Sequence, residues 1–183
     1  MGRRRKRKDL ILTFLDFVIT INLFSIPLYL FIKFGFELPF LKNLEATLAS
    51  KFLSFLGLNA SSSENFVIID NSLYEISWDS TGWKSLYTFF ALVISTPIFH
   101  KRKLKPLLFG LFAIFIFNLL RISATIYLSY KQLYSFDFLH LSLWRFGSIA
   151  FLLLLWFIFL YTQKNNIGEN KNILGFVYGR GKP

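Results

Sequence analysis

Three side chains that lie far apart in the sequence could together carry out acyl-transfer chemistry. Ser80 offers a hydroxyl nucleophile, His140 an imidazole base, and Arg121 a guanidinium that can stabilise an anion. Arg121 is the most informative of the three, because it lies within an apolar run, residues 106–130. Holding this charge in hydrocarbon costs at least ~3 kcal/mol, so an arginine at such a position indicates a functional site.

Each of these residues also has a purely structural explanation. Ser80, or the aspartate before it, could cap a helix, and His140 could be an ordinary interfacial residue. Arg121 could pair with backbone carbonyls or with Asn118. Arg145 competes with His140 for the third position in the site, since it lies five residues further along the same expected helix and about 140° around it.

Neighbouring polar residues support the candidate set. Asn118, Arg121 and Thr125 are spaced so that they share one face of a helix that is otherwise made of Leu, Ile and Phe. This polar stripe is expected to point into a helical bundle. Thr81 and Gly82 directly follow the candidate nucleophile and are also expected to support the site.

The composition indicates an integral membrane protein. Of the 183 residues, 54% are hydrophobic and 20% aromatic, and the mean hydropathy is +0.49. We therefore expect an all-α membrane protein with a single domain, residues 1–183. Four stretches could each supply the roughly 20 apolar residues of a transmembrane helix: 10–34, 82–99, 106–130 and 141–161. The chain has no cysteine and no clustered metal-ligand pattern, so we expect neither a disulfide nor a metal or other cofactor.

The cationic residues indicate how the chain is oriented. The net charge is +11, and Lys and Arg gather before the first stretch, between the second and third, and after the fourth. The intervening segments carry only Lys42, Lys51 and Lys131. Because cytoplasmic segments carry an excess of Lys and Arg, we place both termini in the cytoplasm, including a partly disordered tail at 162–183. This topology accounts for the charge without a nucleic-acid partner.

The longest external segment, residues 35–80, is expected to begin with a helix. Residues 39–58 have large apolar side chains at helical spacing, and Lys42, Glu45 and Lys51 lie on the opposite face. This pattern predicts an amphipathic helix that lies in the outer membrane interface, with the three charged residues facing water.

A short β-hairpin is expected after this helix. Residues 66–69 and 73–78 are rich in β-branched and aromatic side chains, which favour strands. They flank the turn-forming cluster Asp70-Asn71-Ser72. The hairpin would lead directly to Ser80 and the second transmembrane helix.

With this topology the three candidate side chains reach the same depth. Ser80 lies at the outer end of the second transmembrane helix and His140 at the outer end of the fourth. If the third helix begins near Leu107, the helical rise places Arg121 roughly 9 Å below the outer edge of the apolar core. We therefore predict that the hydroxyl, the imidazole and the guanidinium converge in the outer leaflet.

The candidate residues resemble the motifs of the exosortase/archaeosortase family of membrane transpeptidases. Asp79-Ser80-Thr81-Gly82 resembles the Cys-Thr/Ser-Gly motif of the family, and Asn118-Leu119-Leu120-Arg121 resembles its Asn-x-x-Arg motif. His140 resembles the downstream His or Arg of the catalytic set. The resemblance covers residues 77–158, and the first helix more loosely.

This resemblance implies an activity and its partners. Such enzymes cleave secreted surface proteins near a C-terminal sorting signal, which comprises a short motif, a hydrophobic helix and a basic end. They transfer the new carboxyl end to an acceptor, in archaea a membrane lipid. The resemblance implies that residue 80 is the nucleophile, that Arg121 stabilises its anion or the oxyanion, and that His140 handles protons. The chain would act at the extracellular face of an archaeal cell membrane.

The chain departs from the family pattern at residue 80, which is Ser where the family has its nucleophilic Cys. A thiol, with a pKa near ~8.5, readily forms a thiolate beside a cation, whereas a hydroxyl needs a well-placed base. We therefore interpret the chain as an inactive Cys-to-Ser form of a cysteine-type transpeptidase, with a natural serine enzyme or an inactive homologue as alternatives. The competing functions are an intramembrane serine protease using Ser80 and His140, and a non-enzymatic membrane scaffold in which Arg121 pairs structurally.

Overall fold

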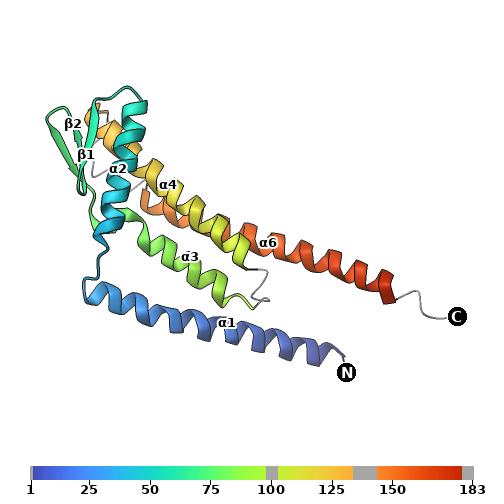
Figure 1. Cartoon of the computed structure of the whole chain (residues 1–183). Helices are drawn as coiled ribbons and strands as arrows, with labels where there is room; N and C mark the ends of the chain where they lie inside the picture. Colours follow the sequence, from blue (N-terminus) through green and yellow to red (C-terminus); the bar gives the residue numbers. More distant parts are fainter. Residues whose placement is uncertain (1, 98–102, 134–143, 179–183) are drawn as a thin grey trace.

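The protein is a bundle of helices with a short helix and a small β-sheet packed at one end (Figure 1). We call this helix and sheet the interfacial layer. The computed structural model describes residues 2–97, 103–133 and 144–178, and the side chains from residue 11 to residue 163 within these ranges except 144 and 145. In chain order the elements are α1 (Gly2–Lys33), α2 (Pro39–Phe55), β1 (Ala60–Ser63), β2 (Phe66–Ile69), β3 (Ser72–Glu75), the 3-10 turn η1 (Trp78–Thr81), α3 (Trp83–Ser95), α4 (Leu104–Tyr130) and α6 (Trp144–Tyr178).

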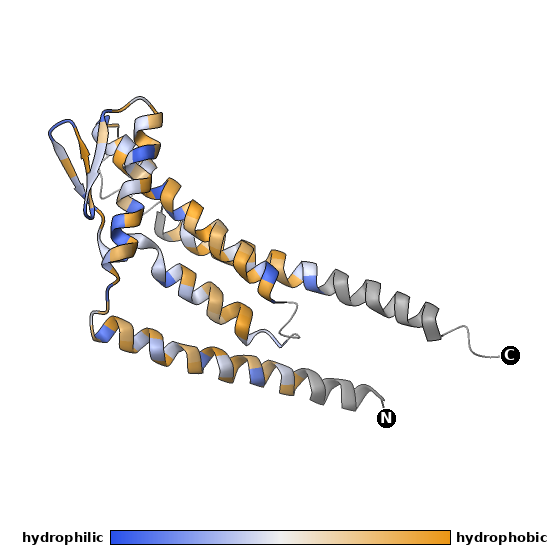
Figure 2. Cartoon of the chain, viewed as in Figure 1, coloured by the Kyte–Doolittle hydropathy of each residue, from blue (hydrophilic) through white to orange (hydrophobic). Residues whose placement is uncertain are grey.

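Three helices of the described chain are long and apolar enough to cross a membrane. They are Ile11–Lys33 within α1, Leu104–Tyr130, which is all of α4, and Phe146–Gln163 within α6. Figure 2 shows that apolar residues dominate along all three. The chain is therefore a multi-pass membrane protein, as its composition predicts.

Helix α3 is shorter than the transmembrane helix expected over 82–99. It has 13 residues and ends at Ser95, because Thr96 takes an extended backbone conformation with ψ of 125°. Thr96 precedes Pro97, and a residue before proline is disfavoured in helical conformation. A transmembrane helix over 82–99, and with it the count of four membrane-spanning helices, is therefore not confirmed.

The last helix is longer than expected. α6 continues to Tyr178, whereas a partly disordered tail was expected from residue 162. The sequence from Trp144 to Tyr178 contains no proline, so nothing in it forces the helix to end earlier. The N-terminal end of α1 and the C-terminal end of α6 both point away from the sheet (Figure 1).

Helix α2 confirms the helix expected over 39–58, but one residue was placed on the wrong face. Glu45 was expected to face water with Lys42 and Lys51, and it is instead fully buried, with no exposed surface. Phe55, in contrast, is 84% exposed. The face of α2 that contacts the rest of the protein consists of Glu45, Ala46, Ala49, Ser50 and Leu53. Small side chains on this face allow the helix to approach its neighbours closely.

The hairpin predicted after α2 is present and belongs to a three-stranded antiparallel sheet with the order β1-β2-β3. Strands β2 and β3 pair with Ile69 opposite Ser72, and the turn between them uses Asp70 at a positive φ of 50°. Strand β1, which pairs with β2, was not predicted, because its sequence, Ala-Ser-Ser-Ser, has low β propensity.

Two apolar clusters hold the elements together. One joins α2, the sheet and the second half of α4, with Leu53, Val67 and Ile122 among its buried residues. The other joins α3, the first half of α4 and α6, with Phe89 and Leu152 among its buried residues. Helix α4 therefore links the interfacial layer to the bundle. Outside these clusters, the hydroxyl of Tyr87 in α3 donates a 2.7 Å hydrogen bond to the carbonyl of Phe24 in α1.

Gly110 of α4 packs directly against Phe89 of α3. A Cβ atom added at Gly110 would lie 2.2 Å from two ring carbons of the buried Phe89. We expect Gly110→Ala to destabilise the protein by roughly 1–3 kcal/mol, since the ring must leave its position. Thermal unfolding in detergent measures this loss. Gly147→Ala in α6 is the matched control, because nothing lies within 4 Å of its Cβ, and equal losses in the two variants would contradict the prediction.

Candidate active site

Ser80 lies in the short 3-10 turn η1 and does not cap a helix. The N-cap of α3 is Gly82, at a positive φ of 67°, and no side chain caps this helix. Asp79 instead forms an exposed ion pair of 2.7 Å with Lys84. The turn is closed by a hydrogen bond of 2.8 Å from the Thr81 hydroxyl to the Trp78 carbonyl. The helix-cap explanation for Ser80 therefore does not apply.

Two side chains from the middle of α4 meet at the main chain of Ser80. Arg121 donates from Nη2 to the Ser80 carbonyl at 2.7 Å, and Asn118 donates from Nδ2 to the same oxygen at 3.0 Å. The Ser80 hydroxyl forms a hydrogen bond of 2.8 Å with the Ser77 hydroxyl. Thus Arg121 does pair with a backbone carbonyl, as its structural explanation requires, but the carbonyl is that of the candidate nucleophile.

Gly82 is required by both its conformation and its surroundings. Its φ of +67° is disfavoured for other residues, and an added Cβ would lie 2.8 Å from Cγ and from Oδ1 of Asn118. Any side chain at this position would force the Asn118 amide to shift. Gly82, which follows the turn, is therefore packed directly against the Asn118 amide, which holds the turn.

Glu45, which the sequence analysis placed on an exposed face, lies beside this cluster. Its Oε1 accepts a hydrogen bond of 3.0 Å from Asn118 Nδ2. Its Oε2 has no hydrogen-bond partner among the described residues. Burial raises the pKa of the Glu45 carboxyl from 4.5 to about 8, although the hydrogen bond from Asn118 and the positive charge of Arg121 act to lower it. A sequence signal was available, since Glu45 shares a helical stripe with the small residues of α2.

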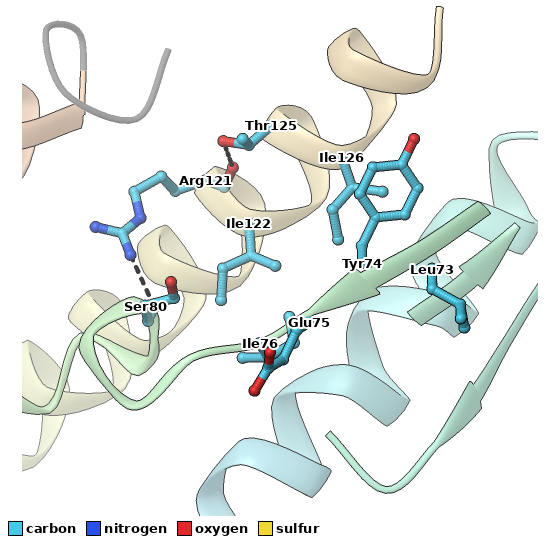
Figure 3. Close-up of a pocket in the computed structure, with 9 residues that line it drawn as sticks. All are labelled: Leu73, Tyr74, Glu75, Ile76, Ser80, Arg121, Ile122, Thr125 and Ile126. Carbon is cyan, nitrogen blue, oxygen red and sulfur yellow. Dashed lines mark hydrogen bonds between the residues drawn. The ribbon is translucent and has the colours of Figure 1, made fainter. Parts of the chain in front are cut away.

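A pocket opens next to Ser80 and Arg121 (Figure 3). Its volume is about 220 Å³, and one wall is formed by residues 73–76, which are the last three residues of β3 and the residue after it. The opposite wall is α4, including Thr125, whose hydroxyl donates a hydrogen bond of 2.8 Å to the Arg121 carbonyl. The pocket is large enough for one or two side chains of an extended peptide.

The remaining candidates cannot be placed at this site. His140 lies outside the described residues. Arg145 is the second residue of α6, and its side chain also lies outside the described part of the chain. Within the described residues, no group of three or more His, Cys, Asp or Glu side chains could hold a metal ion.

The fold and the cluster at its end define a class of protein: a multi-pass membrane protein with a polar site where the bundle meets its interfacial layer. A protein-family model described as "transmembrane exosortase" matches residues 10–161, and the chain belongs to this family. The exosortases are transpeptidases of the cysteine type, which makes the chain a member of a family of membrane protein-sorting enzymes. Searches of curated proteins and of solved structures found no match.

The raised pKa of Glu45 predicts a pH dependence of stability. Between pH 4.5 and about 8 the folded protein keeps a proton on Glu45 that the unfolded chain releases, so stability falls as the pH rises through this window. Glu45→Gln removes this titration and should flatten the decline of the unfolding temperature, measured in detergent between pH 5 and pH 8. Glu64→Gln, at an exposed turn position, is the control and should keep the decline. A parallel decline in all three proteins would contradict the assignment.

Proposed function

We propose that the chain is an archaeosortase-like sorting transpeptidase. It would cleave the C-terminal sorting signal of secreted surface proteins at the outer membrane face and transfer the new carboxyl end to a membrane lipid. The observation that supports this most strongly is the meeting of Arg121 and Asn118 at residue 80, across a long separation in sequence and beside a pocket. These are the residues in which the chain resembles the family motifs.

In this proposal the chemistry takes two steps. The nucleophile at position 80 attacks the scissile carbonyl carbon, the peptide C–N bond breaks, and the leaving amine takes a proton. The acceptor lipid then attacks the covalent intermediate, gives up a proton, and releases residue 80. Arg121 stabilises the nucleophile's anion or the oxyanion, and His140 moves the protons, with Arg145 as the alternative for that position.

The serine at position 80 makes this chain the inactive form of such an enzyme. The Ser80 hydroxyl bonds to the Ser77 hydroxyl, which is no base, and the nearby Arg121 is always charged and cannot accept a proton. A cysteine at the same position could ionise to a thiolate beside the guanidinium without a base. Among the described side chains no base contacts the hydroxyl, so the serine protease alternative depends on His140 as the base.

Replacing the serine tests the proposed activity. We expect Ser80→Cys to process a membrane-bound substrate that ends in a sorting signal, while the parent chain does not. Mass spectrometry of the product distinguishes transfer, which adds a lipid, from hydrolysis, which leaves a free carboxylate. Ser77→Cys, with a thiol in the preceding turn, is the matched control and should be inactive. Failure of Ser80→Cys with natural archaeal lipids and several signals would refute the transpeptidase proposal.

The same variant tests the task of Arg121. Since the chain has no other cysteine, the rate of alkylation of Ser80→Cys against pH reports a single thiol. We expect its pKa to lie about one unit or more below the ordinary ~8.5, because the guanidinium favours the thiolate. Arg121→Gln should restore the ordinary value, and Arg121→Lys should fall between, since it keeps the charge but loses the planar fork. A scaffold role for Arg121 would leave all three alkylation profiles alike.

A further inference from the structure

The Asn118 side chain is held by two acceptors at once. Its single amide nitrogen donates to Glu45 Oε1 and to the Ser80 carbonyl, each at 3.0 Å. An amide nitrogen has two hydrogens, and both are used here. A flipped amide would turn its own oxygen toward two other acceptors, so the orientation of Asn118 depends on both partners being present.

We propose that Glu45 is a positioning residue of the active site: by accepting a hydrogen bond from Asn118, it holds the amide that fixes the main chain of residue 80. The interfacial helix α2 is then part of the site, although none of its residues lines the pocket. The effect of Glu45 on the rate of signal processing rests on the proposed transpeptidase function, whereas its effect on the position of residue 80 does not.

A purely structural role does not explain a carboxyl group at this position. Glu45 is completely buried on a face shared with Ala46, Ala49 and Leu53, where an apolar side chain would pack without cost. Burying a carboxyl group is unfavourable unless it is fully hydrogen-bonded, and Oε2 has no partner among the described residues. Arg121 lies near enough to affect the charge on Glu45, but the two form no ion pair within 4 Å. Among the described residues, the only hydrogen bond to the carboxyl comes from Asn118.

The role depends on an acceptor at position 45 rather than on a negative charge. With a pKa of about 8, Glu45 is mostly protonated at neutral pH, so glutamine is a close mimic with an oxygen in the same place. Leucine fills similar space but offers no acceptor. Glu45→Leu would leave one Asn118 hydrogen without a partner and free the amide to rotate away from Ser80.

The two substitutions are compared in the Ser80→Cys background. We expect Glu45→Leu to lower kcat for signal processing about tenfold, the effect of losing roughly one hydrogen bond, with KM unchanged. The alkylation profile of the thiol at position 80 should shift toward that of an ordinary cysteine. Glu45→Gln should restore most of kcat and the original profile. Leu53→Ala is the control: it opens a cavity on the same face of α2, so it should lower stability without moving either readout.

The outcomes separate this inference from the proposed function. If no variant processes a signal, the transpeptidase proposal fails, and the alkylation profiles alone still decide the role of Glu45. The inference is overturned if Glu45→Leu keeps the profile of the Ser80→Cys parent, or if Glu45→Gln shifts it as much as Glu45→Leu does. It is also overturned if Leu53→Ala shifts the profile as strongly, because loss of packing would then suffice.

Discussion

The structure around the site depends on one requirement, which is that the guanidinium of Arg121 needs acceptors in the middle of an apolar helix. A charge without such a partner would be costly in the membrane. The Ser80 carbonyl meets the requirement, with a hydrogen bond of 2.7 Å. To bring this carbonyl to α4, the chain must turn sharply before α3, and the 3-10 turn and Gly82 at positive φ provide that turn. The geometry of residue 80 is therefore a consequence of where the arginine lies.

The interfacial layer completes what the bundle alone cannot supply. Helix α2 and the sheet pack on the second half of α4 through one apolar cluster, and Glu45 of α2 accepts a hydrogen bond from Asn118 of α4. The same packing brings β3 alongside α4, where the two form opposite walls of the pocket. The same contacts thus position the backbone at residue 80 and form the pocket beside it.

The sequence predicted the elements well where a long apolar pattern or a strong local signal existed. The span of α4, the start of α2 at Pro39 and the β2–β3 turn are examples. It failed for Glu45, because large apolar side chains were assumed to mark one face and charged ones the water-facing side. At a membrane surface, Phe55 can face lipid while small residues face protein, so this assumption reverses. The contact between Glu45 and Asn118 joins distant segments, and no local pattern encodes it.

The hydrogen bond made by Arg121 also limits the chemistry that the site can perform. A guanidinium has five N–H donors, and among the described residues only Nη2 is bonded, to the Ser80 carbonyl. That bond anchors the cation beside residue 80, where its charge would stabilise an anion. An arginine can stabilise such an anion but cannot create it by removing a proton. A thiol can ionise to a thiolate beside the cation, whereas a hydroxyl does not, so the contact with Arg121 suits a cysteine at position 80 better than a serine.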